Sequence, residues 1–139
     1  MRVRRGDLLT PVAGWSFDLV LPNPPYVPAP AAACPRRGPA RAWDAGRDGR
    51  LVLDRISQDV PALLKPGGTL LLVQSELSCP EESLRRLRTS GLHADTVEHR
   101  SVAFGPVLRS RSDWLHDRGL IEDDTEREEL VVIRAVRPE

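Results

Sequence analysis

The sequence predicts an α/β fold with a mostly parallel sheet. Short apolar runs of strand length recur at 17–21, 69–74 and 130–136. Between them, 51–64 has apolar residues at helical spacing, and 80–90 opens with a proline followed by two glutamates. Strands that alternate with helices are typical of a parallel sheet with helices on both faces, so we expect that architecture here.

Composition limits the class of protein. The chain has 139 residues, which suits one domain, and its 20 basic and 20 acidic residues give no net charge. A non-specific nucleic-acid binder is usually more basic. No apolar run is long enough for a transmembrane helix, and Cys34 and Cys79 fit no metal or redox motif. We therefore expect a cytoplasmic protein with free thiols, without a metal site and without membrane attachment.

The elements can be placed in order along the chain. The first residues, through Leu9, predict a strand end and then a loop. Residues 22–41 hold seven of the 13 prolines, so this segment must be a loop and cannot be a helix. After it the pattern predicts a helix at 51–64 that Pro61 shortens, a turn at 65–68 and a strand at 69–74. A helix at 80–90 and a strand at 94–100 follow. The chain then has an insertion at 109–129, with one helical turn at 112–118, and a last strand at 130–136.

The segment most informative about chemistry is Asn23-Pro24-Pro25-Tyr26, which directly follows the apolar run Phe17–Leu21. Ligands of open α/β sheets bind beyond the C-terminal ends of strands. The prolines lack an N–H, so their carbonyls are acceptors without a competing donor, and the Asn23 amide oxygen is another acceptor. Two acceptors held close together can bind both hydrogens of one NH2 group, while Tyr26 offers a flat face to a planar group.

Such a site suits a poorly nucleophilic nitrogen. The lone pair of an amide or aromatic amine is delocalised, and hydrogen bonds to both N–H groups orient the nitrogen and stabilise positive charge as it forms a bond. The sequence has no Ser or Cys in a nucleophile motif with a histidine base, so hydrolase chemistry is not indicated.

The stretch FDLVLPNPPYV resembles motif IV of class I S-adenosylmethionine-dependent methyltransferases that act on NH2 nitrogens conjugated to a planar group. The stretch AWDAGRDG at 42–49 and the turn KPGG at 65–68 are similar to the release-factor glutamine N5-methyltransferases of the HemK/PrmC type. The resemblance implies the C-terminal part of a Rossmann-like sheet, mostly parallel with an antiparallel last strand, and S-adenosyl-L-methionine as the methyl donor.

The resemblance also assigns roles to residues. It implies that Asn23, Pro24 and Tyr26 form the catalytic acceptor site, with Pro25 and Trp43 contacting the substrate. It implies that Asp7, Leu8 and again Asn23 contact the cofactor, with the Asp7 carboxylate meeting the adenine amine.

One departure from the family pattern is large. No glycine-rich loop precedes Asp7, so we expect residues 1–139 to be a partial methyltransferase domain, truncated at its N-terminus, with an active-site loop region at 22–50 and an insertion loop at 109–129. Residues 17–21 would then be an open sheet edge. We expect this chain alone to bind S-adenosylmethionine weakly or not at all.

The resemblance implies methylation of a protein glutamine side chain, with a peptide-chain release factor as the candidate substrate and a small activating subunit as a further candidate partner. The alternatives are an adenine-N6 methyltransferase acting on nucleic acid and, in another class, a non-catalytic truncated homologue. Neutral charge and the 42–49 stretch favour the protein substrate over nucleic acid.

Overall fold

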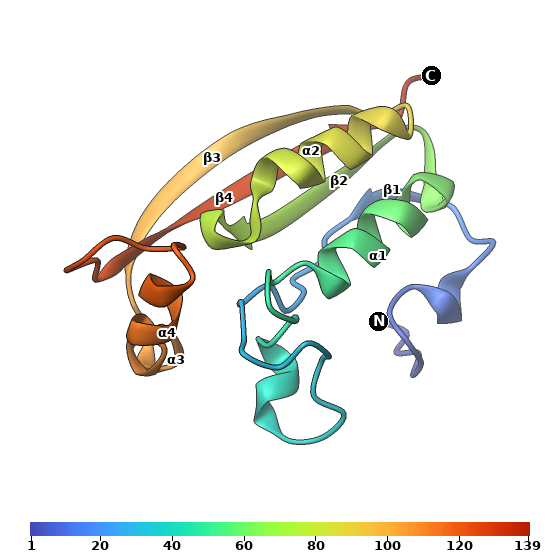
Figure 1. Cartoon of the computed structure of the whole chain (residues 1–139). Helices are drawn as coiled ribbons and strands as arrows, with labels where there is room; N and C mark the ends of the chain where they lie inside the picture. The colour runs from blue at the N-terminus through green and yellow to red at the C-terminus, as the bar shows by residue number, and fades with distance from the viewer.

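The computed structural model describes all 139 residues and contains one four-stranded sheet in the order β1-β2-β4-β3 (Figure 1). β1 and β2 are parallel, whereas β4 is antiparallel to both β2 and β3. Three strands therefore run in one direction and the last strand runs against them, which confirms the predicted α/β class. The strands are β1 (Phe17–Val20), β2 (Leu64–Ser75), β3 (His93–Ala103) and β4 (Arg127–Val136).

Helices fill the connections between strands. Pro61 lies where α1 gives way to a 3-10 turn, which confirms that this proline shortens the helix. Pro80 opens α2 at a position where its missing N–H has no intrahelical partner to lose. The α-helices are α1 (Leu51–Asp59), α2 (Pro80–Thr89), α3 (Pro106–Ser110) and α4 (Ser112–Asp117), and the 3-10 turns are η1 (Thr10–Val12), η2 (Pro39–Ala42), η3 (Val60–Leu63) and η4 (Glu76–Ser78).

The expectation of helices on both faces of the sheet was wrong for this chain. α1 and α2 contact each other, α2 also contacts β3 and β4, and the buried side chains of both helices share one core with β2 and β4, so the two helices cover the same face (Figure 1). The reason is the direction of the connections. The two crossovers, β1 to β2 and β2 to β3, move the same way across the sheet, and right-handed crossovers in one direction place their helices on one side.

The core lies between that face and the two helices. Leu70 and Leu72 of β2 are fully buried against Ile133 and Ala135 of β4. Alternate residues point the other way, and the second face keeps only half-buried apolar side chains. The remaining members of the core cluster are Val52, Leu53, Ile56, Val60, Leu64, Leu87, Leu92 and Ala94.

Local differences from the predicted elements have simple causes. Residues 1–5 form no strand, since no neighbouring strand pairs with them. The predicted turn at 65–68 lies inside β2 as an irregularity, because the pairing moves from Phe17 opposite Leu64 to Leu19 opposite Thr69. Gly67 adopts a φ of 76° there, which glycine allows without a Cβ clash.

The segment 104–126 between β3 and β4 is more ordered than predicted. It carries α3 and α4 around a small second core of Phe104, Leu108 and Leu115. α4 confirms the predicted helical turn, whereas α3 was not predicted, although Gly105-Pro106 is a typical helix start. β4 begins at Arg127, so the last three residues of the predicted insertion belong to the strand.

None of the helices combines the length and the apolar character that crossing a bilayer would need. No group of three or more His, Cys, Asp or Glu side chains is placed to hold a metal ion. Both cysteines are free.

Candidate functional site

A cleft of about 260 Å³ opens just beyond the C-terminal end of β1. It joins residues that are far apart in the sequence: the proline corner, the loop around Trp43, the start of α3 and the start of β4. The residues that line it are Asn23, Pro24, Tyr26, Val27, Ala42, Trp43, Gly105, Pro106, Val107, Leu108 and Glu128. Four of the residues predicted to form the acceptor site, Asn23, Pro24, Tyr26 and Trp43, thus lie around one opening.

The Asn23 side chain is available for a ligand. Asn23 is exposed at the cleft and makes no side-chain hydrogen bond within the chain, whereas Pro24 is buried behind it. A side-chain amide that capped the backbone of its own loop would have used its oxygen internally. The amide oxygen of Asn23 therefore remains free to accept a hydrogen bond from a group in the cleft.

Backbone pairing holds the two walls of this loop together. Val27 N–H donates to the Trp43 carbonyl at 2.8 Å, and Ala45 N–H donates to the Val27 carbonyl at 3.1 Å. These bonds form an isolated parallel bridge between Val27 and Asp44, which places the Trp43 ring beside the proline corner. The bridge brings Trp43 to the cleft even though it lies 16 positions after Val27 in the sequence.

A buried ion pair fixes the same loop to the 104–126 segment. Nη1 of Arg111 lies 2.7 Å from Oδ1 of Asp44, and the two side chains are only 19% and 12% exposed. The same nitrogen donates to the Pro28 carbonyl at 3.1 Å. One guanidinium therefore holds the segments on both sides of the Val27–Asp44 bridge, and this contact was not predicted from the sequence.

Two titratable groups face the cleft. Burial raises the pKa of the Tyr26 phenol, and the nearby Glu128 carboxylate raises it further. Burial also raises the pKa of Glu128, although the Ser75 hydroxyl opposes this shift, and the Glu76 carboxylate adds to it. Tyr26 is therefore neutral at physiological pH and can act by packing and by hydrogen bonding.

Sequence reasoning missed Glu128. It stands in a run of acids, and such a run is typical of a solvated insertion loop. The signal that could have found it is its position directly before the apolar run of the last strand, where period-two alternation directs Glu128 and Glu129 to opposite faces. The pairing of β4 with β2 and β3 then decides which of the two acids reaches the cleft.

The residues predicted to contact the cofactor lie elsewhere. The Asp7 carboxylate is paired with Arg55 at 2.5 Å, with the Asp7 side chain 69% exposed. Its hydrogen bond with Arg55 lowers the pKa of Asp7. Neither Asp7 nor Leu8 lines the acceptor cleft, and Pro25 is half-buried beside the cleft without lining it. The structure thus gathers acceptor-side residues in one place but does not join them to the predicted donor-side residues.

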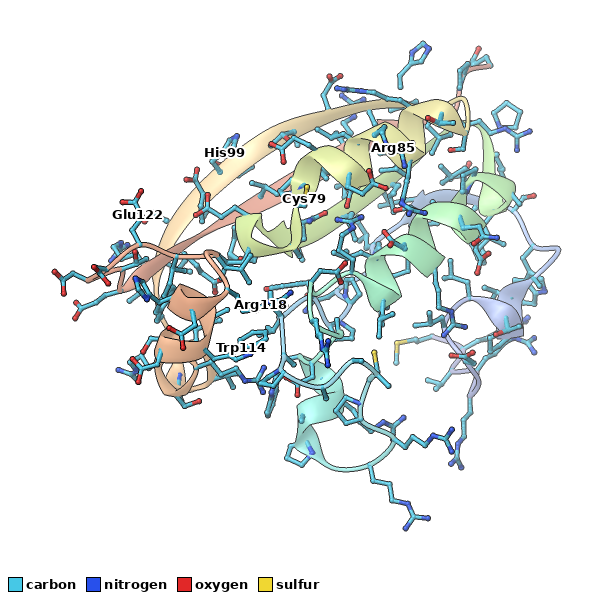
Figure 2. All side chains as sticks on the ribbon, viewed as in Figure 1. Cys79, Arg85, His99, Trp114, Arg118 and Glu122 are labelled. Carbon is cyan, nitrogen blue, oxygen red and sulfur yellow. The ribbon has the colours of Figure 1, made fainter.

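Three other openings are larger than this cleft. One, of about 560 Å³, lies in the 104–126 segment and is lined mainly by polar and charged side chains, including Glu122, while the second, of about 500 Å³, includes Cys79 and His99 (Figure 2). The third, of about 370 Å³, lies between residues 9–14 and 58–63. None of the three contains Asn23 or an aromatic stacking surface beside a free amide. The acceptor cleft is therefore the better candidate site.

Comparison with known proteins identifies the relationship. The chain is 42% identical over 85 residues to the methyltransferase HEMK2 of Homo sapiens, covering 61% of this chain and 40% of that protein. It is 35% identical over 102 residues to a putative protein N5-glutamine methyltransferase of Methanocaldococcus jannaschii, covering 73% of this chain and 51% of that protein. The chain is a homologue of protein glutamine methyltransferases. No family model matches it.

The homology extends to bacterial proteins and to the fold. A release factor glutamine methyltransferase of Rhodospirillum rubrum is 43% identical over 70 residues, covering 47% of this chain and 21% of that glutamine methyltransferase. A chain in the structure of the Mtq2–Trm112 complex of E. cuniculi, described as responsible for methylating the termination factor eRF1, matches with a TM-score of 0.55 and 24% identity, covering 86% of this chain and 51% of that chain. This likeness supports the methyltransferase fold. The chain spans about half the length, or less, of these relatives.

Proposed function

We propose that the chain forms the acceptor side of an S-adenosylmethionine-dependent N-methyltransferase that acts on the side-chain amide of a protein glutamine. The observation that carries the proposal is the cleft in which a free Asn23 amide and the donor-free corner at Pro24 lie beside Tyr26 and Trp43. The names of its homologues, which are protein glutamine methyltransferases, favour glutamine over adenine.

The residues of the cleft suit an amide ligand. The Asn23 side-chain oxygen and the Pro24 carbonyl are acceptors, and an amide NH2 has two hydrogens to donate. The rings of Tyr26 and Trp43 provide flat apolar surface for the planar amide. Holding both hydrogens orients the nitrogen and stabilises positive charge on it, so these residues contribute by positioning and electrostatics.

S-adenosylmethionine supplies the methyl group in this proposal. On the donor side, this chain offers Asp7 and Leu8, but Arg55 engages the Asp7 carboxylate and neither residue lines the cleft. Asp7 would have to exchange Arg55 for the adenine amine. We therefore propose that the 139-residue chain by itself binds the cofactor weakly or not at all, and that its contribution lies at the acceptor side.

The proposed macromolecular partners are a protein substrate, with a peptide-chain release factor as the specific candidate, and a small activating subunit. The exposed apolar edge at β1 is consistent with a need for protein contact, since Leu19 is 50% and Leu21 is 64% exposed. The proposed domain assignment is a partial methyltransferase domain over 1–139, with the active-site loop region at 22–50 and the insertion loop at 109–129.

The acceptor side can be tested without the cofactor. A capped Ala-Gln-Ala peptide is titrated into the chain while NMR follows the Trp43 indole and the Tyr26 ring, with capped Ala-Glu-Ala and deoxyadenosine as matched ligands. We expect saturable shifts with the glutamine peptide alone, because the glutamate peptide has no NH2 to donate. Asn23→Ala should weaken binding by roughly fivefold, the effect of one lost hydrogen bond.

The control is Asp18→Asn. Asp18 lies on the exposed edge strand β1 and its carboxylate pairs with Lys65 at 2.9 Å in the native chain, so this variant should bind the peptide as the native chain does. Preferential binding of deoxyadenosine would instead support the adenine alternative. Absence of any saturable shift would leave the non-catalytic homologue as the better description.

A further inference from the structure

Glu128 is the one charged side chain among the residues that line the acceptor cleft. It is half-buried and forms no ion pair, and the Ser75 hydroxyl offsets part of the rise in its pKa that burial causes. Two basic residues of the neighbouring segments have other partners: Arg111 binds Asp44, and Arg127, which precedes Glu128 in β4, binds the Ser101 hydroxyl and carbonyl. The cleft therefore contains a carboxylate without a cationic partner.

The neighbouring acid shows how different this environment is. Glu129 points to the opposite face of the sheet, where its Oε1 lies 2.9 Å from Nδ1 of His99. A half-buried carboxylate with a single hydroxyl donor loses more hydration than it recovers, and burial accordingly raises the pKa of Glu128. A ligand that brings N–H groups into the cleft would supply the missing donors.

The other polar groups of the cleft do not accept hydrogen bonds from all the N–H groups that such a ligand brings. Asn23 and Pro24 would accept the two hydrogens of the glutamine side-chain amide. The main-chain N–H groups of the ligand take no part in these bonds. A polypeptide that inserts a glutamine here also brings its own main-chain N–H groups to the mouth of the cleft, where they lose water and need acceptors. Glu128, from β4, is the acceptor provided by a different wall of the same cleft.

We propose that Glu128 is a substrate-positioning residue whose carboxylate accepts main-chain N–H hydrogen bonds from the polypeptide on either side of the acceptor glutamine. This inference rests on the proposed function, because it assumes that a glutamine side chain occupies the Asn23–Pro24 corner. It adds a specificity element: the cleft binds an amide that belongs to a polypeptide more tightly than the same amide alone.

The test compares two ligands and three proteins. The ligands are the capped Ala-Gln-Ala peptide and the same peptide N-methylated at the main-chain nitrogens of the glutamine and of the following alanine. The proteins are the native chain, Glu128→Gln and the adjacent control Glu129→Gln. Charged acceptors form hydrogen bonds roughly twice as strong as neutral ones, so Glu128→Gln should bind the unmodified peptide about fivefold more weakly.

The Glu129→Gln control should keep native affinity. N-methylation should weaken binding to the native chain and to Glu129→Gln, and it should weaken binding to Glu128→Gln much less, because the bond that it removes is already lost. If the native chain binds the peptide and Glu128→Gln binds it equally well, the role assigned to Glu128 is wrong while the proposed function stands. If no protein binds either peptide, both proposals fail.

A second readout does not depend on a variant. Carboxyl ¹³C chemical shifts give the pKa of Glu128 in the free and bound native chain. Burial raises that pKa in the free chain, with Glu76 adding to the shift, and Tyr26 is the other titratable group in the cleft. Binding through the carboxylate favours the ionised form, so the pKa should fall on binding, and affinity should decrease as pH falls through the raised value. An unchanged pKa in the peptide complex would overturn the proposal, and Glu76→Gln serves as the control for the neighbouring acid.

Discussion

Gly49 shows how one residue shapes the acceptor loop. Its φ is 72°, and a Cβ at this position would overlap the carbonyl oxygen of Tyr26. A side chain here would therefore be strained by the backbone angle and would also push on the residue that packs over the proposed amide site. The requirement for glycine comes from this close approach as much as from the turn.

Substituting Gly49 with alanine should destabilise the chain and disturb the cleft. Gly38 is the matched control, because it has a φ of 82° and open space within 4 Å of where a Cβ would lie. Gly38→Ala should cost about 1 kcal/mol of unfolding free energy, the effect of the backbone angle alone. Gly49→Ala should cost clearly more than Gly38→Ala, and it should shift the NMR signals of Tyr26 and Trp43. Urea unfolding and the two-dimensional NMR spectrum measure both effects, and equal costs would show that the contact with Tyr26 is unimportant.

At the residue scale, the sequence indicates a shared location best where residues are close in the chain. Asn23, Pro24 and Tyr26 lie within four positions, so their common location follows from a strand that ends at a proline. Trp43 was placed near them only through the resemblance. Glu128 and Arg111 were not predicted, because their roles depend on strand register and on packing across more than 60 residues, which composition and spacing do not encode.

The element that most affects the site is the 104–126 segment. Its α3 start supplies one wall of the cleft, and Arg111, between α3 and α4, holds the opposite wall through Asp44 and the Pro28 carbonyl. A buried ion pair of this kind contributes little net stability compared with an apolar pair, but removing one partner leaves a buried charge. The contact therefore controls the position of the loop.

Arg111→Ala should loosen the loop more than it weakens the whole fold. The Asp44 carboxylate would remain buried without a partner, a change that typically costs about 3–5 kcal/mol locally. Hydrogen exchange should then accelerate at Val27, Ala29 and Ala45, whose amides form the loop's backbone bonds, before it accelerates in β2. The exposed neighbour Arg109→Ala should leave these amides protected. Unchanged exchange at the three amides in Arg111→Ala would mean that the backbone bridge holds the loop without the ion pair.

The elements themselves were largely predicted, with errors where pairing overrides local signals. The strand at 69–74 extends to Leu64–Ser75 because its ends find partners in β1 and β4. The Lys65-Pro-Gly-Gly68 turn was recognised from its residues, but its absorption into a strand required knowledge of Arg137, whose N–H donates to the Gly68 carbonyl at 2.9 Å. Local composition identifies such a bend but does not say which strands run past it.

Across the whole molecule, the sheet is packed on one side. Residues directly opposite each other in β2 and β4 share a face, so Leu72 with Ile133 points into the core and Val73 with Val132 points away from it. The sequence alone could not reveal this, because TLLLVQ is apolar at successive positions and such a run is typical of a strand covered on both faces. Only the topology shows that both crossover helices lie on the same side.

Two adjacent leucines of β2 provide the test of this one-sided packing. Leu72 is fully buried under the helices, while Leu71 is half-buried opposite the exposed Arg134. Leu72→Ala should cost about 2–5 kcal/mol of unfolding free energy, since it leaves a cavity in a packed core. Leu71→Ala removes the same atoms from a surface already in partial contact with water, so it should cost less than about 1.5 kcal/mol.

Urea unfolding of both variants gives the comparison, and the slope of the transition reports the surface exposed on unfolding. Equal costs would contradict one-sided packing and would mean that something covers the second face in solution. Sedimentation of the native chain at several concentrations would then distinguish self-association, which makes the cost at Leu71 depend on concentration, from a cover formed within a single chain, which does not.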